Sequence, residues 1–215
     1  MTDPPLDWQG HRGARGLLPE NSIPAFLKAL EFPTITTLEL DVAVSSDRQI
    51  IISHEPWFSE KICAKPNGEP VGEEEAESLR IYEMTYEEIQ RYDCGSRGHP
   101  GYPEQEAVAV HKPGLREMVA AVRSYCAENE RELPRYNIEI KSRPEWDGVY
   151  TPPVEEFARL LLAEIGELGI RESTCVQSFD MRALRAVHGL DSTLVTAFLT
   201  EHSRPVAESL AELGY

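Results

Sequence analysis

Residues 37–44 read Thr-Leu-Glu-Leu-Asp-Val-Ala-Val, a run typical of a β-strand. Successive side chains of a strand point to opposite faces, so Glu39 and Asp41 share one face and the aliphatic residues between them share the other. The aliphatic face suits covering helices, which leaves both carboxylates on the inner face. Two such carboxylates repel each other and resist desolvation unless a cation or a basic group compensates them. This strand therefore predicts a site for a hard divalent cation such as Mg²⁺ or Ca²⁺.

The same alternation returns at residues 137–141, which read Asn-Ile-Glu-Ile-Lys. The isoleucines face out, so Glu139 and Lys141 face in and add a third carboxylate and a cation. A single strand of this kind is more typically an edge strand with its polar face in water. Two strands with acidic inner faces in one parallel-sheet pattern favour a shared interior site instead.

Strand-like runs alternate with helical patterns along the chain, which predicts an α/β protein with a parallel sheet. Six runs have the composition of strands: 6–13, 37–44, 49–54, 135–141, 174–178 and 193–199. Apolar residues at helical spacing predict helices in most of the gaps. The first of these helices begins at Asn21 or Ser22. The second follows Pro113, the third ends before Gly169, and the fourth follows the cap Asp180. The last includes Val206, Leu210 and Leu213.

Residues 56–106 break this rhythm with Gly, Pro and Glu, and carry one helix signal, at Thr85–Tyr92, where Glu88 completes a capping box. We interpret the segment as an insertion between the third strand and its helix, lying over the mouth of the site. Its aromatic residues could shape a pocket, although packing of a small subdomain is the simpler role. They are Trp57, Phe58, Tyr82, Tyr86 and Tyr92.

Composition and charge exclude several classes of protein. A chain of 215 residues with 41% hydrophobic content predicts one principal domain over 1–215. A formal charge of −16 argues against nucleic acid or an anionic membrane as a partner. Any phosphate substrate must therefore find positive charge locally.

The compartment is predicted from what the sequence lacks. Its first residues have no signal core, and no apolar run reaches the roughly 18 residues of a transmembrane segment, so we expect a cytoplasmic protein. The cysteines are scattered and are interpreted as free thiols, which favours a reducing compartment. They are Cys63, Cys94, Cys126 and Cys175.

Two histidines stand at the ends of predicted strands, where barrel enzymes collect catalytic groups. His11 ends the first strand and His54 ends the third. A lone histidine is more often structural, and we interpret the other four in that way. The sequence has no Gly-x-Ser-x-Gly elbow, P-loop or dinucleotide fingerprint, so acid–base pairs and a metal are the remaining chemistry.

Taken together, four motifs resemble those of the glycerophosphodiester phosphodiesterase family in order and spacing. They are HRGARGLLPENSIPAF at 11–26, ELDV at 39–42, SHEP at 53–56 and NIEIKS at 137–142, with a weaker match in VQSFD at 176–180. The resemblance implies a TIM-type (β/α)8 barrel of the kind found in phospholipase C-like phosphodiesterases.

The resemblance also implies a role for each motif residue. Glu39, Asp41 and Glu139 would bind one divalent cation, Mg²⁺ or Ca²⁺, with Glu20 supporting the site. His11 and His54 would be the general acid and base. Arg12 and Lys141 would bind the substrate phosphate and so supply the local positive charge.

The implied reaction is metal-dependent hydrolysis of a glycerophosphodiester to an alcohol and sn-glycerol 3-phosphate, the activity of class EC 3.1.4.46. One histidine would remove the attacking proton and the other would protonate the leaving alcohol. Attack by the glycerol hydroxyl, through a cyclic phosphate, is favoured by the resemblance over direct attack by water. The alcohol and the oligomeric state stay open.

The chain departs from the family pattern in two ways. It has His54-Glu55 where the family has His-Asp, and Glu55 can still accept a hydrogen bond beside the histidine. It also has six predicted strands, whereas an eight-stranded barrel typically takes about 250 residues. We therefore expect the last part of the barrel to be absent from the chain.

Two other functions remain as alternatives. A related barrel phosphodiesterase acting on another lipid-derived diester should carry an apolar rim or a basic membrane-facing patch, and the acidic charge argues against that. A noncatalytic barrel that binds a metal or a phosphodiester has no need of a matched acid and base.

Overall fold

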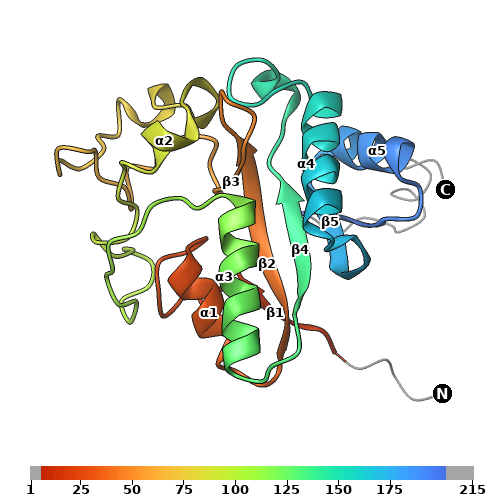
Figure 1. Cartoon of the computed structure of the whole chain (residues 1–215). Helices are drawn as coiled ribbons and strands as arrows, with labels where there is room; N and C mark the ends of the chain where they lie inside the picture. The colour runs from red at the N-terminus through yellow and green to blue at the C-terminus, as the bar shows by residue number, and fades with distance from the viewer. Residues whose placement is uncertain (1–5, 202–215) are drawn as a thin grey trace.

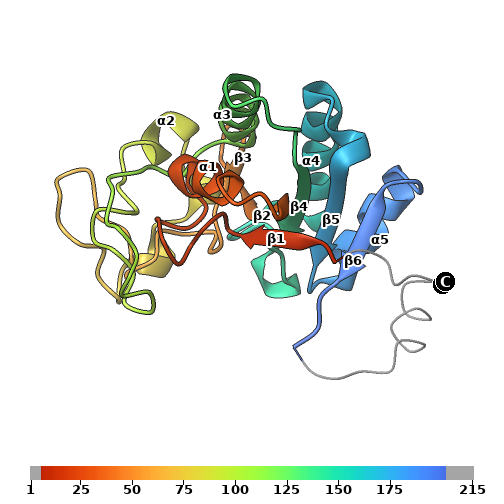
Figure 2. The same cartoon turned by 90° about the horizontal axis from the view of Figure 1, so that it is seen from below.

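The computed structural model describes residues 6–201. Its centre is a parallel sheet in the strand order β1-β2-β4-β5-β6 (Figures 1 and 2). The strands are β1 (Trp8–His11), β2 (Ile35–Val44), β4 (Arg135–Ile140), β5 (Thr174–Ser178) and β6 (Val195–Phe198). All five lie within the runs predicted from the sequence or extend them by two residues, as β2 does.

Helices pack along one side of this curved sheet, as Figure 2 shows. They are α1 (Ile23–Leu30), α3 (Leu115–Glu128), α4 (Val154–Leu168) and α5 (Met181–Leu190). Ser22 caps α1 by accepting a hydrogen bond from the N–H of Ala25, and Gly169 ends α4 in the left-handed conformation at φ 64°. The alternation of strand and helix is the layout of a TIM-type β/α barrel.

The core between helices and sheet confirms the predicted alternation in β2. Leu38, Leu40 and Val42 are fully buried in a cluster with apolar residues of the four helices. The intervening Glu39 and Asp41 are buried on the opposite face of the same strand. One strand thus separates the apolar core from a polar interior.

The third predicted strand is shorter than expected and runs the other way. It is β3 (Ile50–Ile52), which pairs antiparallel with the end of β2 and lies off the main strand order. Its turn is closed by a hydrogen bond from the N–H of Ser45 to the carbonyl of Gln49. A connection this short cannot make the crossover that parallel strands require, so the expectation of a third barrel strand was wrong.

Residues 56–106 build a second apolar cluster beside the hairpin, at the left of Figure 1. The segment contains the short helix α2 (Tyr86–Ile89), and Thr85 and Glu88 form the predicted capping box. Two 3₁₀-helices, η1 (Ala76–Ser78) and η2 (Ile81–Glu83), precede it; η3 (Pro144–Trp146) and η4 (Arg171–Ser173) lie later in the chain.

A disulfide joins Cys63 to Cys94 within this segment, so the prediction of four free thiols was wrong for this pair. The interpretation of a reducing compartment loses its basis, because it rested on all four thiols. Cys126 and Cys175 are free, as predicted.

Most aromatic residues of the insertion pack rather than line a pocket. Phe58 is fully buried and stacks on Tyr92 with ring centroids 3.8 Å apart, and the Tyr86 hydroxyl accepts a hydrogen bond from the N–H of Gly114.

Two further predictions concern membranes and the end of the chain. No helix among residues 6–201 is both long and apolar enough to cross a membrane. The helix predicted at Val206, Leu210 and Leu213 lies outside the described residues.

Candidate active site

Three buried carboxylates meet on the inner face of the sheet. Asp41 of β2 is in register with Glu139 of β4, and Glu39 lies one strand repeat before Asp41. One carboxylate oxygen from each residue lies within 4.8 Å of the other two. The structure thus brings together all three ligands predicted from the sequence.

The electrostatics of this cluster favour the binding of a cation. Burial, and next the carboxylate of Asp41, raise the pKa of Glu39 to about 8, and burial also raises the pKa of Glu139. Arg12 opposes the effect of burial on Asp41 and holds the pKa of that carboxyl below its usual value. Oδ1 of Asp41 is buried with no hydrogen-bond partner among the described residues. Crowded oxygen donors with an unsatisfied buried atom suit a hard divalent cation.

Arg12 holds the first strand against the cluster. Its Nε lies 3.1 Å from Oδ2 of Asp41, its Nη1 donates to Glu20 at 2.8 Å, and its backbone N–H donates to Glu39 at 2.9 Å. Arg12 has a positive φ of 53°, and Gly13 follows at 76°, where a β-carbon would meet the backbone of Ala25 at 2.6 Å. This turn therefore requires glycine after Arg12.

Glu20 supports the site from outside the acidic cluster. It binds Arg12 and also Nη2 of Arg15, at 2.7 Å. The other predicted cation, Lys141, donates to Glu139 at 2.9 Å and lies 3.8 Å from Asp41.

Both predicted histidines face the same cavity of about 520 Å³ above the carboxylates. Nε2 of His11 lies 3.8 Å from Glu39, and its side chain is 59% exposed. Burial, and then Arg12, lower the pKa of His11. His54 arrives through the hairpin: the N–H of Ser53 donates to the carbonyl of Asp41 at 3.0 Å. The sequence therefore predicted correctly that His54 lies beside the carboxylates, but the strand before it is antiparallel and not the expected barrel strand.

Glu55 is bonded to the second histidine. Its Oε1 lies 2.8 Å from Nδ1 of His54, as expected for an acceptor that replaces aspartate. Burial would raise the pKa of Glu55, but His54 and then Lys112 lower it to about 2. Glu55 is therefore an anion that orients the imidazole ring.

Sequence reasoning missed three polar residues that contact these groups. Asn21 donates to Asp41 at 2.9 Å, Gln177 donates to Glu39 at 2.8 Å, and the buried Lys112 donates to Ser53, the residue before His54, at 2.7 Å. Asn21 stands in the Pro-Glu-Asn motif and Gln177 alternates with buried Val176 on β5. The motif and the strand alternation could therefore have indicated these two residues. Lys112 lies in a loop, where no periodicity marks it.

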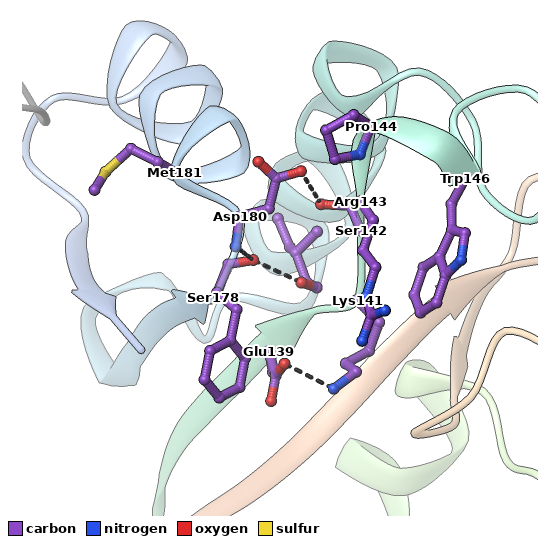
Figure 3. Close-up of a pocket in the computed structure, with 11 residues that line it drawn as sticks. Glu139, Lys141, Ser142, Arg143, Pro144, Trp146, Ser178, Asp180 and Met181 are labelled. Atoms are coloured by element: carbon purple, nitrogen blue, oxygen red, sulfur yellow. Dashed lines mark hydrogen bonds and ion pairs between the residues drawn. The ribbon is translucent and has the colours of Figure 1, made fainter. Parts of the chain in front are cut away.

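A second cavity, of about 290 Å³, opens beside the acidic cluster between the ends of β4 and β5 (Figure 3). Glu139 and Lys141 lie at its border, and Arg143, Trp146 and Asp180 lie farther out. The two cavities adjoin, because they share the lining residues Glu139, Lys141, Arg143 and Phe179.

Comparisons with known proteins agree with this geometry. The model of the glycerophosphoryl diester phosphodiesterase family matches residues 11–214. A glycerophosphodiester phosphodiesterase of Bacillus altitudinis is 29% identical over 191 residues, covering 88% of this chain and 64% of that protein. A second, from Bacillus subtilis, is 26% identical over 194 residues, covering 89% of this chain and 58% of that protein.

Solved structures share the fold. A Silicibacter pomeroyi protein, named as a candidate glycerophosphoryl diester phosphodiesterase, superposes with a TM-score of 0.83 at 23% identity, over 99% of this chain and 74% of that one. An Oleispira antarctica phosphodiesterase in complex with the product sn-glycerol-3-phosphate gives 0.70 at 20% identity, over 97% and 72%. These similarities confirm the TIM-type barrel.

The chain spans less than two thirds of the length of the curated relatives it matches, between 58% and 64%. The family match nevertheless covers nearly all of this chain, including every motif residue discussed above. The chain belongs to the glycerophosphoryl diester phosphodiesterase family.

Proposed function

We propose that this protein hydrolyses glycerophosphodiesters to an alcohol and sn-glycerol 3-phosphate, and that it needs one divalent cation, Mg²⁺ or Ca²⁺. The observation that carries the proposal is a cluster of three carboxylates, two of which, Glu39 and Glu139, line one cavity together with two histidines. The Oleispira relative, solved with sn-glycerol 3-phosphate, supports the product.

Glu39, Asp41 and Glu139 would hold the cation. When bound, it would stabilise negative charge on a phosphate oxygen and lower the pKa of a coordinated hydroxyl. Arg12 and Lys141 lie beside these carboxylates, so their remaining N–H groups are available to a phosphate that enters the cavity.

We assign the base to His54 and the acid to His11. A neutral imidazole whose Nδ1–H donates to Glu55 presents Nε2 as an acceptor, which suits removal of a proton from the attacking hydroxyl. His11 enters the cavity from another strand, and its imidazolium would protonate the oxygen of the leaving alcohol. If the attacking oxygen is the glycerol hydroxyl, water opens the cyclic phosphate in a second step, so either route consumes one water.

The test is release of sn-glycerol 3-phosphate from glycerophosphocholine by the purified protein, with EDTA and after restoring Mg²⁺ or Ca²⁺. We expect release that EDTA stops and metal restores. His11→Ala should lower kcat by about 10²–10⁴-fold without weakening metal binding, because it removes a proton donor and no metal ligand. His111→Ala, which removes an imidazole bonded to Glu117 outside the acidic cluster, is the matched control.

Two results would contradict the proposal. Unchanged turnover in His11→Ala would rule out the assigned acid. No release of any alcohol by folded, metal-loaded protein would favour a noncatalytic phosphodiester-binding barrel.

A further inference from the structure

The smaller cavity beside the acidic cluster has a mixed lining. Glu139 and Lys141 lie at one end of it, and the apolar side chains of Trp146 and Met181 lie on opposite sides of the view (Figure 3). Phe179 borders both cavities and is 47% exposed. A ligand centred over the carboxylates therefore lies next to the smaller cavity.

Most charges around this cavity are already paired. Lys141 is bonded to Glu139, and Asp180 accepts hydrogen bonds from Arg182 and from Ser142. Arg143 is different, because its guanidinium has no acidic partner among residues 6–201 and instead lies 4.7 Å from the ring centre of Trp146. The unpaired charge of the lining is therefore positive.

The position of Arg143 is fixed by its neighbours. Its backbone is extended, at φ −149° and ψ 154°, the conformation that the following Pro144 favours. Trp146 is in turn held by Trp57, with ring centroids 5.7 Å apart, and by Tyr150, at 6.1 Å. The guanidinium thus rests on a supported aromatic surface, which reduces the entropy lost on binding a ligand.

We propose that this cavity binds the alcohol part of the substrate and that Arg143 selects alcohols carrying an acidic group over cationic alcohols such as choline. This inference rests on the proposed function, which puts phosphate and glycerol over the acidic cluster and leaves the adjoining cavity to the alcohol. A guanidinium forms charge-assisted hydrogen bonds with a carboxylate or phosphate and repels a quaternary ammonium. The apolar side chains of Phe179 and Met181 suit the carbon chain between the two charged ends.

Three diesters of sn-glycerol 3-phosphate test the inference. Two carry 3-hydroxypropionate and 3-hydroxypropionamide, which have the same shape and differ in one negative charge, and the third is glycerophosphocholine. The measured quantity is the ratio of kcat/KM for carboxylate over amide. We expect a ratio of about two to five in the unmodified protein, since a single exposed charge pair contributes up to about that factor.

Variants at Arg143 should change this ratio in a set order. Arg143→Lys should keep part of the preference, Arg143→Ala should bring the ratio near one, and Arg143→Glu should invert it and favour glycerophosphocholine. Arg159→Ala is the control, because Arg159 is an exposed arginine of α4 that lines neither cavity, and its ratio should equal that of the unmodified protein.

The outcomes separate this inference from the proposed function. Hydrolysis of all three diesters with no carboxylate preference, or with the same preference in Arg143→Ala, would overturn the role of Arg143 and leave the activity standing. Hydrolysis of none of them would overturn the activity itself.

Discussion

At the scale of single residues, Lys112 is linked through Ser53 to the segment that carries His54, the proposed general base. Its Nζ donates to Ser53 Oγ at 2.7 Å, and the same hydroxyl donates to the carbonyl of Glu55 at 2.5 Å. Burial lowers the pKa of Lys112, while the nearby Glu55 carboxylate opposes that effect. Glu55 in turn orients His54. Lys112 thus lies near the carboxylate that fixes the imidazole ring and helps to lower the pKa of that carboxylate.

Replacing this lysine should affect both turnover and stability. We expect Lys112→Met to lower kcat by about tenfold, because a poorly oriented imidazole transfers protons less efficiently. The substitution also removes the hydrogen bond to Ser53 and a positive charge near the Glu55 carboxylate, so the free energy of unfolding should fall by about 1–3 kcal/mol.

Steady-state kinetics and urea unfolding would measure the two effects. Lys28→Met, on the surface of α1, is the control. An unchanged kcat in folded Lys112→Met protein would mean that Lys112 is only a packing residue.

Glu139 should show the opposite pattern. Glu139→Gln keeps the shape of the side chain but removes a charge from the acidic cluster, so the affinity for Mg²⁺ should fall by at least about tenfold. Calorimetric titration of the protein with the metal measures this without relying on activity. An unaltered metal affinity would contradict the role of Glu139 as a ligand.

At the scale of elements, Asp93 attaches the insertion to the barrel. Its Oδ1 accepts hydrogen bonds from the N–H groups of Gly95, Ser96 and Val110. Burial would raise the pKa of Asp93, but the bonds from Ser96, Gly95 and Val110 lower it below its usual value. The charged form is therefore the one that stabilises this junction.

This gives a pH-dependent prediction. A depressed carboxyl pKa contributes stability that is present above the ordinary aspartate pKa, near 3.8, and is lost as pH falls through the lower folded value. Asp93→Asn should therefore lower the free energy of unfolding by about 1 kcal/mol at pH 7, and the difference should shrink below pH 4. Urea unfolding of the oxidised proteins at pH 7 and pH 3 measures it. A difference that is equal at both pH values would show that the charge is not involved.

The hairpin β2–β3 is the element that sequence reasoning got wrong, and the signal was present. Residues 45–49 are too few for a crossover, so the antiparallel direction of β3 could have been deduced from loop length. The Cys63–Cys94 disulfide left no such signal, since its members are 31 positions apart in the chain and only short helices lie between them. Distance along the chain carries no information on pairing when no regular element fixes the geometry between two cysteines.

At the scale of the whole molecule, the parallel sheet was predicted from the alternation of strands and helices, and the acidic cluster from the alternation of side chains along the strands. Strand alternation put Glu39, Asp41 and Glu139 on the inner face, and the structure has all three there. Motif resemblance added the histidines. The contacts that depend on loops, such as Lys112 with Ser53 and Arg143 on Trp146, could not be predicted, because loop side chains have no fixed period.

The register of β2 with β4 also links the metal to folding. Asp41 and Glu139 are almost a hundred residues apart and are neighbours only when β2 and β4 are paired. The unfolded chain therefore has no comparable set of oxygen ligands. A cation that binds the folded state alone raises the free energy of unfolding by about 2.7 kcal/mol at a hundred times its Kd. EDTA should therefore lower the Tm, and Mg²⁺ or Ca²⁺ should restore it, with a smaller change in Glu139→Gln at the same metal concentration. The supply of divalent cation would then set how much of the protein stays folded, in addition to how fast it works.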